Sequence, residues 1–220
     1  MTDHAHHRPP SQREVNDHFD ERAVTWHTEQ RHVDNARLAA DAITSAIDLD
    51  PSWSALEVGS GTGLLSGFLA PHLGPIVLLD PSPGMTQAAR SRLTAAGDTQ
   101  QTPVCLDLTE ATPPGAPYDL AYSLLALHHV ADTAALLSAV RQVLKPGGWL
   151  AILDLASEDG SFHGHDRTDI AHHGFDPTWL LETTEQVGFH EVHVTVAGHL
   201  VKGTEDGDRD FPLLMLTARA

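Results

Sequence analysis

The sequence has 220 residues, of which 41% are hydrophobic and 20% charged, and its formal net charge at pH 7 is −17 with histidine neutral. This length and composition predict one globular domain, or one domain with a lid, and exclude a disordered chain or a disulfide mini-scaffold. The negative charge repels phosphate backbones and anionic lipid surfaces, so we expect neither a nucleic acid nor a membrane as partner.

The cellular compartment is predicted from cysteine usage and from the N-terminal residues. Cys105 is the only cysteine, which excludes an internal disulfide, and the first residues lack the basic and apolar regions of a signal peptide. No apolar run approaches the ~18 residues of a membrane helix. These features predict a reduced, cytoplasmic, soluble protein.

The first 50 residues are predicted to form a tail and a helical cap. Residues 1–13 are polar, aperiodic and rich in histidine and proline, which predicts a flexible tail. In residues 14–50 apolar side chains recur every three or four positions, as on one face of a helix. They indicate two helices with a break near residues 28–31, the first marked by Phe19, Ala23 and Trp26 and the second by Val33, Ala36, Ala40, Ile43 and Ile47.

From residue 51 onwards, strand-like and helix-like segments alternate. Strands are expected at 53–58, 75–80, 102–107, 118–126 and 149–155, and helices at 64–72, 82–96 and 132–144. Strands that alternate with crossover helices predict a parallel sheet covered on both faces, which is the doubly wound α/β class.

The C-terminal part departs from this alternation. Residues 190–201 and 211–220 are strand-like, and their acidic, glycine-containing connection has no helical pattern. We therefore expect an antiparallel hairpin at the sheet edge, and seven strands in all. Residues 156–175 are polar and rich in histidine, and they follow a strand end, where ligands of such sheets bind. We interpret them as a lid on a ligand-binding domain that spans residues 51–220.

The strongest functional signal is the loop LEVGSGTG at residues 56–63. Its glycines let the backbone pass close to a ligand, which a Cβ would block. The dinucleotide fingerprint G-x-G-x-x-G needs a glycine where Leu64 stands, and no lysine follows the loop as in a P-loop. The loop therefore disfavours a nicotinamide-dependent oxidoreductase and excludes a P-loop nucleotidase.

Two carboxylates at later strand ends extend this signal. Asp80 ends the second strand, where it can accept hydrogen bonds from both hydroxyls of a ribose. Asp107 ends the third strand, where it can accept from an adenine amino group, although a strand-end aspartate often simply begins a turn. Loop and acids together describe a nucleoside site without a diphosphate.

With these motifs the sequence resembles the class I S-adenosylmethionine-dependent methyltransferases from about Trp53 to Ala220. LEVGSGTG, LLDPSPGM and CLDL are similar to the first three motifs of the family, and YDLAYSLLALHHV and VLKPGGWLAILD to its fourth and fifth strands. The resemblance implies the Rossmann-like methyltransferase fold and S-adenosylmethionine as cofactor. It also implies these roles: Glu57 orders the loop, Gly59, Ser60 and Gly61 line the cofactor, Asp80 binds the ribose, Pro81, Met85 and Leu108 flank the adenine, Asp107 approaches its amine, and Ser123 and Leu124 lie under the methionine part.

Methyl transfer by in-line displacement depends mainly on alignment, so it requires neither a metal nor a covalent intermediate. A general base adds ~10²–10⁴ in rate when the acceptor is a hydroxyl. The candidates are two histidine pairs, His128 with His129 after the fourth strand and His172 with His173 in the lid. We name His129 and His173 as the catalytic candidates. The lid histidines at 163, 165, 172 and 173 fit no compact metal-ligand pattern, so no metal is predicted.

Absent motifs narrow the acceptor. The fourth strand ends in SLLA, unlike the Asn/Asp-Pro-Pro-aromatic motif of enzymes that methylate planar amide or base nitrogens. Together with the acidic charge, this predicts a small molecule methylated on O, N or C. Its pocket is expected to be walled by Trp26, His27, Arg31, Phe162, His163, Phe175 and Trp179. An S-adenosylmethionine-binding sensor or regulator without methyl transfer remains an alternative, and the chain is either a monomer or a homodimer.

Overall fold

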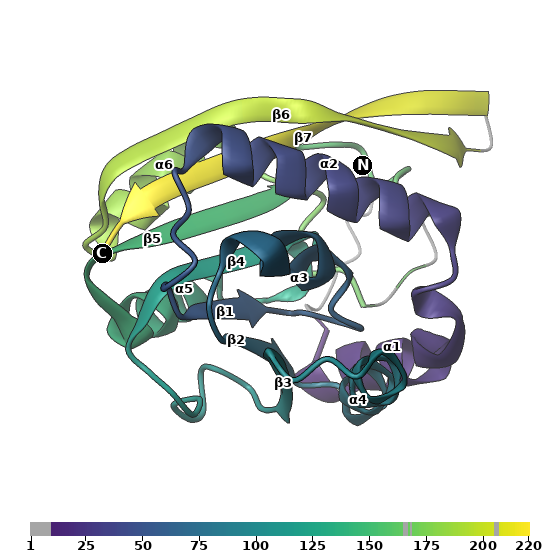
Figure 1. Ribbon diagram of the computed structural model, residues 1–220. Helices are drawn as coiled ribbons and strands as arrows, with labels where there is room; N and C mark the ends of the chain where they lie inside the picture. Colours follow the sequence, from purple (N-terminus) through teal and green to yellow (C-terminus); the bar gives the residue numbers. More distant parts are fainter. Residues whose placement is uncertain (1–9, 165–166, 168, 205–206) are drawn as a thin grey trace.

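The structure is a computed structural model that describes residues 10–164, 167, 169–204 and 207–220. Its centre is a seven-stranded sheet in the order β3-β2-β1-β4-β5-β7-β6 (Figure 1). The strands are β1 (Ala55–Val58), β2 (Ile76–Asp80), β3 (Gln101–Cys105), β4 (Tyr118–Leu124), β5 (Leu144–Leu155), β6 (His190–Thr204) and β7 (Gly207–Arg219). The first five are parallel, and β7 is antiparallel to both β5 and β6. The predicted doubly wound sheet with a reversed terminal hairpin is confirmed.

Helices cover both faces of the sheet. They are α1 (Gln12–Trp26), α2 (Gln30–Ala46), α3 (Leu64–Leu69), α4 (Pro83–Ala96), α5 (Thr133–Val143) and α6 (Pro177–Gln186), with single 3₁₀ turns η1 (Ala70–His72) and η2 (Leu127–His129). One core cluster joins α2 and α3 to the sheet, and a second joins α5 and α6 to the opposite face (Figure 1). Burial on both faces explains why the parallel strands are continuous apolar runs. None of the helices in the described part of the chain combines the length and the apolar character needed to cross a bilayer.

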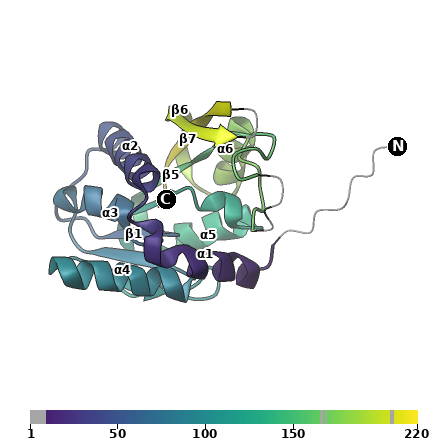
Figure 2. The same cartoon turned by 90° about the vertical axis from the view of Figure 1, so that its right-hand side faces the viewer.

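Helix α1 is attached to the start of α4, and both views show the two helices side by side (Figures 1 and 2). The Asp20 carboxylate accepts hydrogen bonds from Ser82 Oγ at 2.5 Å and from the Gly84 amide at 2.8 Å. Asn16 Nδ2 donates to the Pro81 carbonyl at 3.1 Å. A Cβ on Gly84 would lie 2.8 Å from the Asp20 Cα, so this position allows the close approach. These contacts hold α1 over the carboxyl end of β2.

Several boundaries differ from the predicted ones. The hairpin is longer than expected, because the acidic connection is itself paired, Lys202 with Arg209 and Thr204 with Gly207. Strand β5 begins at Leu144, which pairs with Tyr118, and its register shifts before Trp149. The predicted tail at residues 1–13 lies mostly outside the described residues, and α1 begins at Gln12 after a capping box on Ser11.

Candidate active site

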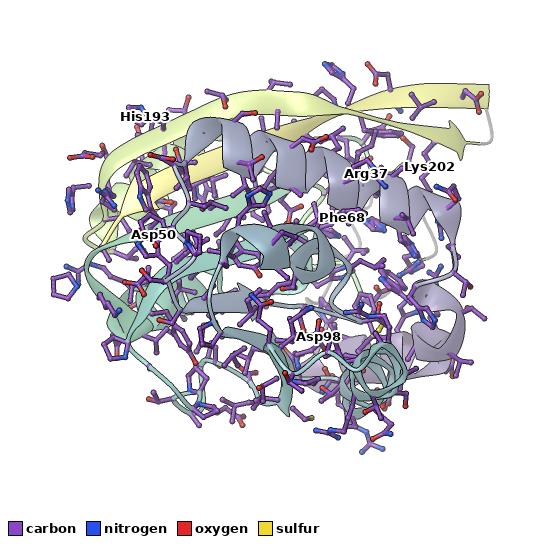
Figure 3. The ribbon with its side chains drawn as sticks, in the orientation of Figure 1. Arg37, Asp50, Phe68, Asp98, His193 and Lys202 are labelled. Carbon is purple, nitrogen blue, oxygen red and sulfur yellow. The ribbon has the colours of Figure 1, made fainter. Side chains whose placement is uncertain are left out.

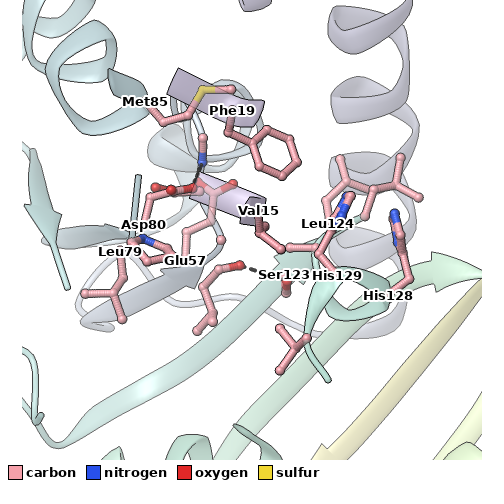
Figure 4. A pocket seen from close by; sticks show the side chains of 18 of the residues that line it. Val15, Phe19, Glu57, Leu79, Asp80, Met85, Ser123, Leu124, His128 and His129 are labelled. Carbon is pink, nitrogen blue, oxygen red and sulfur yellow. Dashed lines mark hydrogen bonds between the residues drawn. The ribbon is translucent and has the colours of Figure 1, made fainter. Parts of the chain in front are cut away.

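A cavity of about 480 Å³ lies where the carboxyl ends of β1, β2 and β4 meet α1 (Figure 4). Small-molecule sites usually occupy about 300–1,000 Å³, so this volume suits a ligand of cofactor size. All residues that the sequence assigns to cofactor binding line it: Glu57, Gly59, Ser60, Gly61, Asp80, Pro81, Met85, Asp107, Leu108 and Ser123. One cavity therefore brings together the predicted cofactor contacts.

The glycine loop connects β1 to α3 in a left-handed conformation. Gly59, Gly61 and Gly63 have φ values of 66°, 52° and 76°, which side chains with a Cβ rarely adopt. A Cβ on Gly59 would lie 2.4 Å from the Ala126 Cβ, so the loop packs directly on the chain that leaves β4. Arg92 on α4 fixes the far side of the loop by donating to the Thr62 and Gly63 carbonyls at 2.9 and 3.0 Å.

Asp80 faces the cavity from the end of β2 (Figure 4). Its Oδ2 accepts a hydrogen bond from the Gly61 amide at 2.7 Å, and its Oδ1 accepts from the Ser82 amide at 2.9 Å. Burial raises the pKa of this carboxyl to about 6. A carboxylate offers about four acceptor sites, so two remain for donors on a ligand.

Glu57 lies behind the loop and connects β1 to its neighbours. Its carboxyl accepts hydrogen bonds from the Ser66 amide at 3.3 Å and from Ser66 Oγ. Ser66 Oγ also lies 2.5 Å from the Tyr122 hydroxyl of β4. Burial raises the pKa of Glu57 to about 8, so the carboxyl is largely protonated at neutral pH. These contacts are in keeping with the predicted role of ordering the loop.

Asp107 stands two residues beyond the end of β3, which stops at Cys105 rather than at the predicted residue 107. Its Oδ1 accepts hydrogen bonds from the Thr109 amide at 2.8 Å and from Thr109 Oγ1 at 2.7 Å. The turn that the sequence left open as an alternative is therefore present. Asp107 and the buried Leu108 nevertheless line the cavity.

The two histidines of η2 are both buried, and each is held by an acidic residue. His128 Nδ1 donates to the Asp154 carboxylate at 2.7 Å, and His129 Nδ1 donates to the Asp169 carbonyl at 2.9 Å. The His129 ring packs edge-on against Phe19 of α1, with 4.9 Å between centroids. Burial, reinforced by the neighbouring His128, lowers the pKa of His129 to about 3. His129 is therefore neutral at physiological pH, with Nε2 carrying the lone pair.

This buried, neutral histidine predicts a loss of stability in acid. In the unfolded chain the His129 ring binds a proton near its ordinary pKa of 6.5, whereas the folded chain resists protonation down to about pH 3. The stability that His129 contributes is complete above pH 6.5 and falls by about 1.4 kcal/mol per pH unit below it.

Urea unfolding between pH 7 and pH 4.5 checks this expectation. His129→Asn, whose amide can still donate to the Asp169 carbonyl, should show a shallower pH dependence than the wild type. The exposed His193 on β6 provides the control, and His193→Asn should leave the dependence unchanged (Figure 3). Equal slopes for His129→Asn and the wild type would contradict the assignment.

Other predicted residues lie away from the cavity. His173 is half exposed on the segment 156–175, with Nδ1 at 3.5 Å from Glu158 Oε1, and it does not contribute to the lining. His172 donates from Nε2 to the Val130 carbonyl at 3.0 Å. Phe175 stacks on Trp179 at 5.8 Å, outside the lining, so the expectation that these two rings wall the pocket is wrong. His27 is also absent from the described lining, whereas Trp26, Arg31, Phe162 and His163 belong to it.

Several lining residues were not predicted from the sequence to lie in the pocket. Val15, Asn16, Phe19 and Arg22 come from α1, Arg167 from the segment 156–175, and Lys202 from β6. The apolar spacing of α1 identified a buried face but not what covers it. The predicted lid residue 165 lies outside the described residues. Within the described residues, no group of three or more histidine, cysteine or acidic side chains is arranged to hold a metal.

Comparisons with known proteins agree with this geometry. Residues 56–150 match the family model described as a methyltransferase domain. The biotin biosynthesis bifunctional protein BioCD of Bordetella avium is 36% identical over 136 residues, which cover 59% of this chain and 28% of that protein. An uncharacterized methyltransferase of Mycobacterium bovis is 31% identical over 122 residues, which cover 54% of this chain and 59% of that protein. The N-methyltransferase NodS of Bradyrhizobium japonicum, solved with S-adenosyl-L-homocysteine, has a TM-score of 0.68 at 15% identity and covers 94% of this chain and 98% of its own.

The structure is a doubly wound sheet with a glycine loop and a cavity at its carboxyl edge, where ligands of such sheets bind. The family match over residues 56–150 and the curated relatives show that this part of the chain is similar to methyltransferase domains. The predicted fold is confirmed. The chain spans 28% and 59% of the length of the two curated relatives, and NodS at 15% identity bears on the fold alone.

Proposed function

We propose that the protein transfers a methyl group from S-adenosylmethionine to an O, N or C atom of a small-molecule acceptor. The observation that carries this proposal is that the Asp80 carboxylate and the glycine loop share one cavity with His129 and the aromatic face of α1. The cofactor supplies a methyl group on a positively charged sulfonium. The chain's own residues bind, align and shield the reactants.

The cofactor end of the cavity fits a nucleoside. Asp80 has two acceptor positions left for ribose hydroxyls, since each of its oxygens accepts one amide. Pro81, Met85 and Leu108 offer apolar surface for a purine, and the Asp107 carboxylate stands at the same end of the cavity. Ser123 Oγ donates to the Val58 carbonyl at 2.8 Å, which joins the ends of β4 and β1 beneath the loop.

At the end of the cavity proposed for the acceptor, the walls are formed by α1 and by Phe162, His163 and Arg167. Phe19 and Phe162 contribute aromatic walls, and Trp26 lies against the glycine loop, where its Nε1 comes within 3.7 Å of a Cβ built on Gly61. Such walls exclude water and hold the acceptor for in-line attack. The net charge of −17 supports a small acceptor over a nucleic acid.

We assign His129 as the residue that accepts the proton of the attacking group. Its Nδ1–H is held by the Asp169 carbonyl, so Nε2 is the nitrogen left to accept a hydrogen bond from an attacking hydroxyl or amine. His173, the other candidate from the sequence, lies outside the lining and takes no part in this mechanism.

The test is turnover with a methyl-labelled cofactor. Release of S-adenosylhomocysteine is measured with a panel of hydroxyl, amine and activated-carbon acceptors. For a hydroxyl acceptor, His129→Asn should lower kcat by about 10²–10⁴, whereas the control His193→Asn should leave it unchanged. Cofactor binding without turnover on any acceptor would instead support a sensor or regulator.

A further inference from the structure

Four basic side chains from four separate segments line the cavity: Arg22 of α1, Arg31 of α2, Arg167 of the segment between β5 and α6, and Lys202 of β6. The whole chain has 13 lysines and arginines against 30 acidic residues. The local charge of this cluster is therefore opposite in sign to the net charge of the chain. This difference suggests that the cations have a specific role in the cavity.

The chain's own carboxylates neutralise this cluster only in part. Glu29 lies 2.7 Å from Arg31 and 3.8 Å from Arg22, and so serves two cations. Asp169 receives both hydrogen bonds of the Arg167 fork at 2.6 Å. Across the described ranges, no carboxylate forms an ion pair with Lys202. The four cations therefore outnumber the two carboxylates that pair with them.

The effect of the neighbouring cations is clearest at Lys202. Its Nζ donates to the Phe162 carbonyl and lies 4.5 Å from the centroid of the Phe162 ring. Burial, together with repulsion from Arg31, Arg167 and Arg22, lowers the pKa of Lys202 to about 8, against a smaller opposing effect of Glu158. The ammonium group is thus held in the cavity wall among other cations, a position that a bound anion would stabilise.

The cluster adjoins the proposed proton acceptor. The Asp169 carboxylate accepts a hydrogen bond from the Arg167 guanidinium. The Asp169 backbone carbonyl accepts another from His129 Nδ1. His163, whose buried Nε2 lacks a hydrogen-bond partner among the described residues, lies 5.7 Å from the His129 ring between centroids. An anion bound by these cations would lie in the same cavity as the atom to be methylated.

Resting on the proposed function, we propose that Arg22, Arg31, Arg167 and Lys202 bind a carboxylate or phosphate group of the methyl acceptor. Arg31 and Arg167 each use one fork on a carboxylate, so their remaining N–H groups and the Lys202 ammonium are the donors left for such an anion. The aromatic walls at Phe19 and Phe162 then favour an acceptor with an apolar body next to its anionic group.

The experiment is a titration of the full chain saturated with S-adenosylhomocysteine. The probes are benzoate and phenyl phosphate, with benzamide as the neutral counterpart, and the two anions distinguish a carboxylate site from a phosphate site. We expect one or both anions to bind, more weakly at higher salt, and benzamide to bind at least about tenfold more weakly.

Lys202→Gln tests the site itself, and Arg37→Gln on the neighbouring helix α2 is the matched control, since Arg37 lies over Phe68 and not in the lining (Figure 3). Lys202→Gln should weaken the anionic probes about tenfold and leave S-adenosylhomocysteine binding unchanged, while Arg37→Gln changes neither. Thermal melts of both variants verify that they are folded.

Three results would overturn the inference. One is equal affinity for the anionic and neutral probes, and another is unchanged anion affinity in Lys202→Gln. The third is anion binding that occurs only without S-adenosylhomocysteine, which would assign the cations to the carboxylate of the cofactor. Failure of S-adenosylhomocysteine itself to bind would count against the proposed function, and titration of the ligand-free protein would still decide the anion site.

Discussion

Replacing Asp80 by alanine is expected to weaken the binding of S-adenosylhomocysteine at least about a hundredfold, because two charge-assisted hydrogen bonds to hydroxyls are lost. The fold should survive, since burial already disfavours the charged carboxyl, as its pKa of about 6 indicates. Isothermal titration measures the affinity, and a thermal melt verifies the fold. Asp50→Asn is the control, because Asp50 accepts from the Ser52 amide in a turn on another part of the molecule (Figure 3).

The same carboxyl predicts how cofactor affinity depends on pH. Its ionised form is the better acceptor, so affinity should be constant above about pH 7 and fall towards tenfold per unit below pH 6. Asp80→Asn should bind the cofactor weakly and show no such pH dependence.

The stability of the fold depends on pH in the opposite direction. A raised carboxyl pKa favours the fold while the group is protonated, and this contribution is lost as pH rises from 3.8 through 6. An Asp80→Ala variant with wild-type affinity would refute the site assignment.

Replacing Asp154 by alanine is expected to destabilise the protein severely. This carboxylate is buried and accepts from His128 Nδ1 at 2.7 Å, from the His128 amide at 3.2 Å and from the Leu155 amide at 2.7 Å. Removing one partner of a buried pair costs about 3–5 kcal/mol. For a chain of this size, that lowers the Tm by roughly 6–20 °C.

The comparison with Asp154→Asn separates hydrogen bonding from charge. The amide oxygen keeps an acceptor for part of this network, so its Tm should lie between those of the alanine variant and the wild type. Because η2 also carries His129, Asp154→Ala should lower turnover more than stability alone explains. A Tm within about 2 °C of the wild type for Asp154→Ala would show that the pair contributes little.

The cofactor half of the site was predictable from the sequence because its signals are local. A buried strand that runs into alternating glycines places the loop, and Asp80 closes the next apolar run. Each inference needs only a few neighbouring residues and the rule that parallel strands end at one edge. The role of Asp107 could not be decided from local sequence, because a carboxylate that starts a turn and one that faces a ligand have the same sequence pattern.

The acceptor half could not be predicted because it is assembled from distant segments. Phe19 and Arg22 lie on a helix whose apolar spacing is the same whether it covers the sheet or a ligand. Arg167 and Lys202 are distant in sequence from the other lining residues, and only the tertiary fold brings them to the cavity. The two histidine pairs look alike in the sequence, and only the tertiary fold puts His129 in the lining and His173 outside it.

The central claim is that the cavity binds the S-adenosyl cofactor, and a thermal melt with S-adenosylhomocysteine, with NADH as control, tests it most directly. Ligand at about a hundred times its dissociation constant adds ~2.7 kcal/mol, which raises the Tm of such a chain by roughly 5–11 °C. The Tm should rise by this amount with S-adenosylhomocysteine and should not rise with NADH. No rise, or a rise with NADH alone, would contradict the assignment of the glycine loop and of Asp80.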